Sequence, residues 1–102
     1  MVFFVRQISW EEYDELAKGN HILIDVRTPE EWSAGHAEGA IHIPLRHLLE
    51  RVREVAPDST TAVITCCNSG GRAGRACEAL HKLGYTNARY IAGLAGQRYQ
   101  AH

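Results

Sequence analysis

Short apolar runs alternate along the chain with segments in which apolar residues recur every three or four positions. The first pattern is typical of strands buried in a parallel sheet, and the second is typical of amphipathic helices. Strands that alternate with helices predict an α/β fold, with a central, mostly parallel sheet and helices on both faces. The expected strands are residues 2–8, 22–26, 40–43, 61–65 and 88–91.

Capping signals and glycines indicate where the helices begin and end. The segments Ser9–Glu12 and Thr28–Glu31 both match the capping box, in which a hydroxyl and a later carboxylate satisfy free N–H groups at a helix start. Gly19, Gly35 and Gly84 are expected to end helices. Further helices are predicted after Pro44, through Leu45 to Val55, around Ala76, Leu80 and Leu83, and after Gly93.

Composition describes an ordinary globular chain. Its 102 residues predict a single domain, residues 1–102 with a core over 8–96, and 45% of them are hydrophobic. A formal net charge of −1 gives no sign of a nucleic-acid or membrane partner. No run approaches the roughly 20 apolar residues that span a bilayer. The apolar start is too short for a signal-peptide core and is interrupted by Arg6.

The three cysteines cannot all pair within the chain, because their number is odd. A reducing compartment is the simplest interpretation, so we expect a cytoplasmic protein. A mature exported domain with a new start codon would look the same, which leaves a periplasmic form open. Cys66 and Cys77 are expected to be small core residues.

The most informative segment is the loop Cys67-Asn68-Ser69-Gly70-Gly71-Arg72, between a predicted strand and a predicted helix. A turn into a helix directs several backbone N–H groups at one point, and the helix dipole and Arg72 add positive charge there. This field favours the thiolate of Cys67. Gly70 and Gly71 let the backbone curl inward with positive φ. The segment therefore predicts a nucleophilic cysteine within a cradle for an anionic group.

Two separated motifs resemble those of the rhodanese family. The first is Asp25–Trp32, followed by Gly35-His36 and Gly39–Pro44; the second is the loop, in which four residues separate cysteine from arginine. The resemblance covers roughly residues 8–96. Within this family, Asn68 and the run Gly74-Arg75-Ala76 most resemble the small phage-shock type of single-domain rhodanese. Ala73 and the segment 92–97 depart from the family's usual serine and its paired glycines with tryptophan.

The resemblance implies a rhodanese-like three-layer sandwich and a thiosulfate sulfurtransferase without a metal or organic cofactor. Cys67 would take sulfur from thiosulfate or a similar small anionic donor as a persulfide and pass it to cyanide, a thiol or a sulfur-relay protein. It implies a structural role for Asp25 and Arg27, for which a buried ion pair or a loop brace is expected, with Glu31 as a possible partner of Arg27. His36 is expected to be a hydrogen-bonding brace. The expected substrate-binding residues are Asn68, Ser69, Gly70, Gly71 and Arg72.

Two alternatives stay open. Five residues separate Cys66 from Arg72, and this is the spacing of the cysteine and arginine in cysteine phosphatases and arsenate reductases. Two residues argue against that register. Thr65 stands where a histidine usually precedes the nucleophile, and Ala73 has no hydroxyl that could assist the leaving thiolate. The second alternative is a persulfide relay or regulatory module with the rhodanese fold. The histidines show no convincing zinc spacing.

Overall fold

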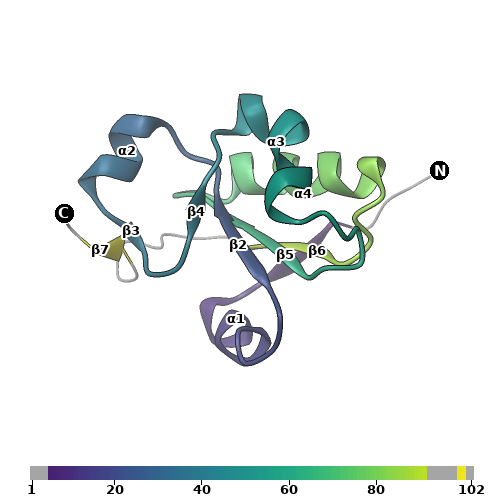
Figure 1. Ribbon diagram of the computed structural model, residues 1–102. Helices are drawn as coiled ribbons and strands as arrows, with labels where there is room; N and C mark the ends of the chain where they lie inside the picture. The colour runs from purple at the N-terminus through teal and green to yellow at the C-terminus, as the bar shows by residue number, and fades with distance from the viewer. Residues whose placement is uncertain (1–4, 92–98, 101–102) are drawn as a thin grey trace.

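A five-stranded parallel sheet lies at the centre of the computed structural model, which describes residues 5–91 and 99–100. Each strand pairs in parallel with its neighbours, so all the carboxyl ends lie along one edge. Figure 1 shows the sheet between helices. In spatial order its strands are β1 (Arg6–Ile8), β6 (Ala88–Ile91), β5 (Val63–Cys66), β2 (Ile22–Asp25) and β4 (Ile41–His42).

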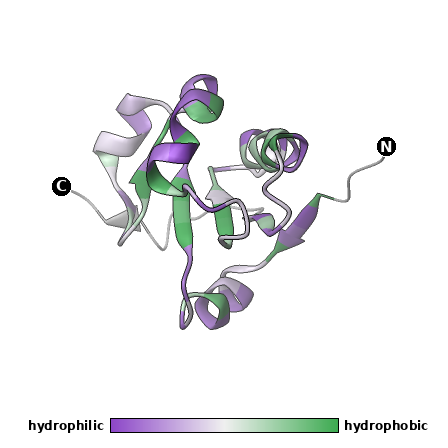
Figure 2. Ribbon diagram, turned by 45° about the vertical axis from the view of Figure 1, so that its right-hand side comes forward, coloured by the Kyte–Doolittle hydropathy of each residue, from purple (hydrophilic) through white to green (hydrophobic). Residues whose placement is uncertain are grey.

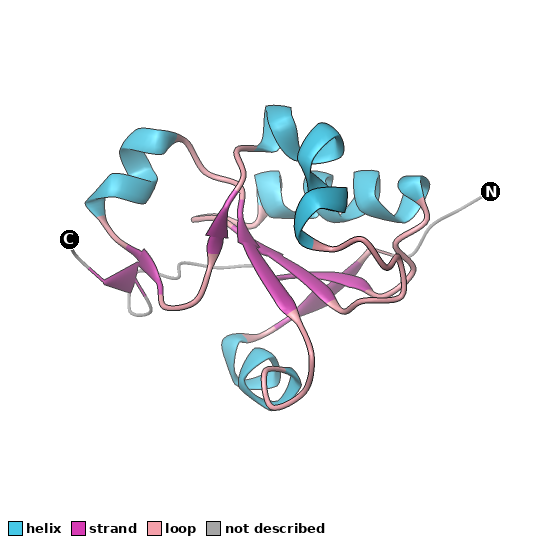
Figure 3. Ribbon diagram, in the orientation of Figure 1, coloured by secondary structure: helices cyan, strands magenta, loops and turns pink. Residues whose placement is uncertain are grey.

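Helices cover both faces of this sheet, which confirms the expected three-layer α/β architecture (Figure 3). On one face lies α1 (Trp10–Leu16), and on the other lie the 3₁₀ turn η1 (Leu45–His47), α3 (Leu48–Val55) and α4 (Gly71–Leu83). Among the described residues, no helix has the length and apolar character to cross a membrane. At the side of the molecule α2 (Pro29–Ala34) leads into β3 (His36–Ala37), which pairs antiparallel with β7 (Tyr99–Gln100).

The sheet separates two hydrophobic clusters, because successive side chains of a strand point to opposite faces. Val63 packs in the cluster beneath α3 and α4, whereas Ile64 packs in the cluster that contains Tyr13 of α1. Figure 2 shows hydrophobic residues along the central strands and hydrophilic residues on the helices. The alternation along β5 therefore determines the face of the sheet to which each residue at the end of this strand points.

Local signals set the helix starts as predicted. The Ser9 hydroxyl accepts a hydrogen bond from the Glu12 N–H at 3.0 Å, and the Thr28 hydroxyl accepts one from the Glu31 N–H at 3.3 Å. Both capping boxes are complete. Gly84, with φ of 107°, ends α4.

Other boundaries differ from the predictions. The first helix ends three residues before Gly19, and the strand predicted at 61–65 is β5, Val63–Cys66. The helix predicted from Pro44 starts as a 3₁₀ turn, since its apolar periodicity does not fix the hydrogen-bond pattern of its first turn. Residues 2–4 of the first predicted strand and the helix predicted after Gly93 lie outside the described residues.

Candidate active site

The thiol of Cys67 lies at the point where β5 ends and α4 begins. The Gly70 N–H donates to Cys67 Sγ at 3.0 Å, and the Ala73 N–H lies 3.4 Å from the same sulfur. Cys67 is fully buried in the cluster beneath α4. Backbone donors at a helix N-terminus favour negative charge on the atom that they face. This geometry can therefore hold an anionic sulfur.

The two loop glycines have different conformations. Gly70 has φ of 90°, in the left-handed region that favours glycine, and it precedes the first helical residue. Gly71 is that first residue of α4 and does not have positive φ. The expectation of positive φ at both positions is thus wrong for Gly71, because the helix begins one residue earlier than that expectation requires. Ser69 is exposed at the tip of the loop.

Glu31 ties α2 to the cysteine loop. Its carboxylate accepts two hydrogen bonds from the Arg72 guanidinium, at 2.6 and 3.0 Å, and one from Asn68 Nδ2 at 2.9 Å. The hydrogen bonds from Arg72 are the main reason why the pKa of Glu31 falls from 4.5 to about 2. Glu31 in turn raises the pKa of Arg72. The pair is therefore ionised at neutral pH.

The structure corrects the expected pairing of Glu31 with Arg27. Arg27 instead forms a buried ion pair with Asp25, with Nη2 at 2.8 Å from Oδ2, and its Nη2 also donates to the Gly35 carbonyl at 2.8 Å. The backbone N–H of Arg27 donates to Asp25 Oδ1 at 3.0 Å. These contacts join the end of β2 to the end of α2, so they fix the position from which Glu31 reaches the loop.

An aromatic stack adjoins this brace. The ring of His36 stacks on Trp32 with centroids 3.4 Å apart, and the ring of His42 stacks on Trp32 at 4.8 Å. His36 Nδ1 lies 3.2 Å from the Trp32 carbonyl, and His42 Nε2 lies 2.8 Å from the Arg27 carbonyl. Of these three residues, the sequence assigns a supporting role to His36 alone. Within residues 5–91 and 99–100, no three side chains of the metal-ligating types come together to hold an ion.

The other two cysteines lie away from the loop. Cys66 is buried in the cluster that contains Tyr13 of α1, on the face of the sheet opposite to the cluster of Cys67. Burial raises the pKa of the Cys66 thiol well above its ordinary value and that of Cys77 to about 11. Neither thiol is paired in a disulfide. A nucleophile at Cys66 would have to act from the wrong face of the sheet, which disfavours the phosphatase register.

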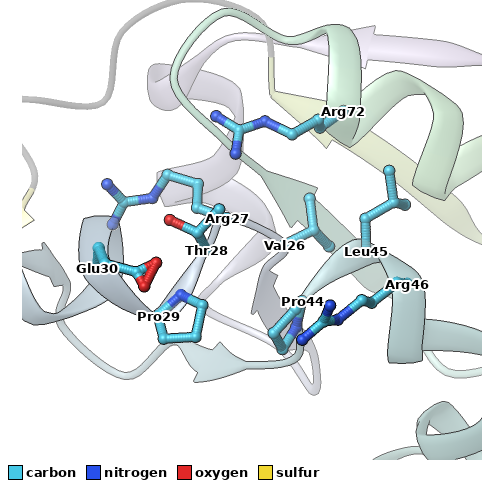
Figure 4. A pocket seen from close by; sticks show the side chains of 9 residues that line it. All are labelled: Val26, Arg27, Thr28, Pro29, Glu30, Pro44, Leu45, Arg46 and Arg72. Carbon is cyan, nitrogen blue, oxygen red and sulfur yellow. The ribbon is translucent and has the colours of Figure 1, made fainter.

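A pocket of about 490 Å³ opens beside the loop, at the carboxyl ends of β2 and β4 (Figure 4). Arg72 forms part of its wall, and Arg46, to which the sequence assigns no functional role, forms another part. Parallel α/β sheets commonly bind ligands at this edge. The lining residues are Val26, Arg27, Thr28, Pro29, Glu30, Pro44, Leu45, Arg46 and Arg72.

Comparison with known proteins identifies similar chains. The Rhodanese-like domain family matches residues 9–93. A thiosulfate sulfurtransferase of Escherichia coli, PspE, is 42% identical over 71 residues, which cover 70% of this chain and 68% of that protein. The chloroplastic thiosulfate sulfurtransferase 16 of Arabidopsis thaliana is 37% identical, over 78% of this chain and 74% of the relative. An Arabidopsis protein named for high arsenic content is 35% identical, and the match spans about half of its length (49%).

Solved structures agree with these matches. The human single-domain sulfurtransferase TSTD1 superposes with a TM-score of 0.80 at 29% identity, and the match covers 92% of this chain and 95% of that one. A structure from E. coli described as a rhodanese with anions gives a TM-score of 0.70 at 40% identity, over 72% and 87% of the two chains. These likenesses extend over most of the chain.

Proposed function

This chain belongs to the rhodanese-like family, and from that premise we propose that it is a thiosulfate sulfurtransferase that acts through a persulfide on Cys67. The observation that carries the proposal is the pair of N–H groups, from Gly70 and Ala73, that face the Cys67 sulfur. Donors in this position can stabilise negative charge on a sulfur that they face, as the transfer of sulfur through a persulfide requires. The named relatives support the same reaction class.

In the first step the Cys67 thiolate attacks the outer sulfur of thiosulfate. A new S–S bond forms to Cys67, the S–S bond of thiosulfate breaks, and sulfite leaves with the electron pair. Total charge is conserved, because the thiolate becomes a persulfide anion and one dianion replaces another. Backbone donors from Asn68 to Arg72 stabilise the charge on the transferred sulfur, and Arg72 contributes hydrogen bonds to the donor.

In the second step an acceptor attacks the outer sulfur of the persulfide. Cyanide becomes thiocyanate, a thiolate becomes a persulfide, and in each case the bond to Cys67 breaks with its electron pair left on Cys67. The enzyme returns to its starting state without a metal or organic cofactor. Donor and acceptor react in turn at one sulfur, so ping-pong kinetics are expected.

The proposal assigns supporting roles to four further residues. Asp25 and Arg27 hold the end of β2, and Glu31 holds Arg72 and Asn68 of the loop. His36 supports the turn after α2 through its stack on Trp32. None of the four is placed in contact with the transferred sulfur.

Intact-protein mass spectrometry after brief thiosulfate treatment tests the proposal. The wild type and Cys66→Ser are expected to gain the mass of one sulfur, and Cys67→Ser is expected to gain none. Loss of the gain in Cys66→Ser alone would move the nucleophile to Cys66, and no gain in the wild type would reject thiosulfate as the donor.

A persulfide relay to a partner protein is the second candidate, because an intact Cys67 loop would serve it equally well. Fast turnover with small acceptors supports the free-standing enzyme, whereas slow turnover with rapid transfer to a protein thiol supports the relay. The three free cysteines suit a reducing compartment such as the cytoplasm, which we retain as part of the proposal.

A further inference from the structure

Arg46 and Glu30 lie on the walls of the pocket beside the cysteine loop, and we propose that together they select the sulfur acceptor. The acceptor class that they favour is a small thiol that carries both a carboxylate and an ammonium group, as amino-acid and short-peptide thiols do. This inference rests on the proposed sulfur transfer and names the substrate of its second step.

The positive charges of two of the three arginines in the pocket wall are balanced by carboxylates of the protein itself. Arg27 is paired with Asp25 at 2.8 Å, and both side chains are almost completely buried. Arg72 is paired with Glu31 at 2.6 Å, and both its terminal nitrogens donate to that carboxylate. A ligand in the pocket therefore meets hydrogen-bond donors there, but no net positive charge from either pair.

Arg46 is the remaining cation of the wall, and among the described residues it forms no ion pair. Its Nε donates to His47 Nε2 at 3.2 Å, and His47 Nδ1 lies 2.7 Å from Glu50 Oε1. His47 contributes no negative charge, so it orients Arg46 without cancelling the charge of the guanidinium. The terminal nitrogens of Arg46 remain available for a carboxylate.

Glu30 supplies the opposite charge. It is exposed in the first turn of α2, and it too forms no ion pair within the part of the chain that the structure describes. Figure 4 shows Glu30 and Arg46 on different sides of the pocket, with Pro29 and Pro44 between them. The two charges face the same space without neutralising each other, which matches a ligand with separated positive and negative groups.

The size and walls of the pocket also favour an organic thiol. Its 490 Å³ lie within the range of small-molecule sites, and cyanide or thiosulfate would fill only a small part of it. The apolar side chains of Val26, Pro29, Pro44 and Leu45 contribute to the lining and can contact the carbon atoms of a thiol. Arg72 belongs to both the pocket wall and the loop that begins with Cys67, so a thiol held in the pocket lies beside that loop.

Four small thiols test the proposal: cysteine carries both groups, 3-mercaptopropionate only the carboxylate, cysteamine only the ammonium, and 2-mercaptoethanol has an uncharged hydroxyl in place of either. The readout is kcat/KM for each thiol with thiosulfate as donor, divided by the value for 2-mercaptoethanol in the same variant. This ratio, compared between variants, cancels the intrinsic reactivity of each thiol.

Arg46→Gln is expected to lower the ratio about fivefold for cysteine and 3-mercaptopropionate but not for cysteamine. Glu30→Gln is expected to lower it similarly for cysteine and cysteamine but not for 3-mercaptopropionate. Both figures correspond to a partly exposed charge pair. Arg51→Gln, an exposed α3 residue outside the pocket wall, is the matched control and should leave all ratios unchanged.

Equal changes for all four thiols in each variant would overturn the charge selection. If the wild-type persulfide forms on thiosulfate treatment but none of the thiols removes it, the acceptor class is wrong while the first step of sulfur transfer stands. If no persulfide forms, the proposed function fails, and the acceptor assignment falls with it.

Discussion

Glu31 shows how one side chain can hold the loop of a candidate active site in place. It contacts Asn68 and Arg72, which follow it by 37 and 41 positions, and the Glu31 and Arg72 side chains are each 28% exposed. Folding lowers the pKa of Glu31 from 4.5 to about 2. The unfolded state therefore binds a proton more readily than the folded state between these values. The stabilisation is complete above pH 4.5 and is lost as the pH falls through about 2.

Glu31→Gln should lower the free energy of unfolding at pH 7 by about 1–2 kcal/mol, between the values typical of exposed and buried ion pairs. At pH 3 the difference from the wild type should be smaller, because Glu31 of the unfolded chain is already protonated there and must release its proton on folding. Urea denaturation at both pH values measures it. The neighbouring variant Glu30→Gln is the control and should leave stability nearly unchanged; an equal deficit for Glu31→Gln at both pH values would refute the electrostatic explanation.

At the scale of single residues, the sequence predicts those features that depend only on neighbours in the chain. Cys67 is predicted as the nucleophile because strand, thiol, glycines and helix are adjacent in the chain. The partner of Glu31 is not predictable in that way, since Arg27 is close in sequence and Arg72 becomes close only when α2 and α4 are in place. The placement of His42 on Trp32 depends on the same long-range packing.

At the scale of an element, the start of α4 shapes the candidate site. Gly70 takes the left-handed conformation immediately before the helix, and Gly71 is already helical. A Cβ on Gly71 would meet nothing closer than Ser69 Oγ at 3.9 Å. The two adjacent glycines therefore differ in what they require: Gly70 needs its conformational freedom, and Gly71 has space for a side chain.

Gly70→Ala should lower the free energy of unfolding by about 1–2 kcal/mol, the cost of a left-handed conformation for a residue with a Cβ. Gly71→Ala should raise it by up to about 1 kcal/mol, because alanine favours a helical position more than glycine does. Chemical denaturation of the matched pair measures both effects. Equal destabilisation by the two substitutions would contradict the assigned backbone conformations.

Helix starts are predictable because a capping box lies within four consecutive residues, as Ser9–Glu12 and Thr28–Glu31 show. The short strand β3 is not predictable from its own sequence, since its two residues become a strand only by pairing with β7. The strands of the large sheet are recognised by their apolar runs, yet their ends shift by one or two residues. Pairing with neighbours, rather than local composition, sets those ends.

For the whole molecule, Tyr85 connects the end of α3 to the segment after α4. It is fully buried, and its hydroxyl donates to the Ala56 carbonyl at 2.5 Å. The guanidinium carbon of Arg53 lies 5.5 Å from the centre of its ring. These contacts hold together the two helices that cover the Cys67 face of the sheet, at a distance from the pocket.

Tyr85→Phe should lower the free energy of unfolding by about 1–2 kcal/mol, because it leaves the buried Ala56 carbonyl without this donor. Sulfur transfer at 25 °C should keep its rate, since no residue of the loop or pocket contacts the hydroxyl. Tyr90→Phe is the matched control: its hydroxyl bonds Gln7 at an exposed position, so the loss should stay below about 0.5 kcal/mol. A similar loss in both variants would refute the role of burial.

The fold class is predictable from the alternation of strands and helices, but the order of the strands is not. Nothing in the local pattern indicates that β1 pairs with β6 rather than with β2. Strand order follows from how all the apolar faces are buried together. The pocket is a product of that order, because the ends of β2 and β4 that form it are adjacent only in the completed sheet.

That strand order also bears on how the protein is made. β1 leaves the ribosome first, yet its partner β6 is the last strand of the large sheet to be synthesised, and Arg6 comes to lie beside Arg89. β5 likewise lacks one of its two neighbours until β6 is available. The loop that carries Cys67 therefore follows a strand that is paired on one side only until residues 88–91 join the sheet. We expect the N–H groups of Gly70 and Ala73 to be held against the Cys67 sulfur only from that point, so the last strand of the large sheet, rather than the loop itself, completes their arrangement.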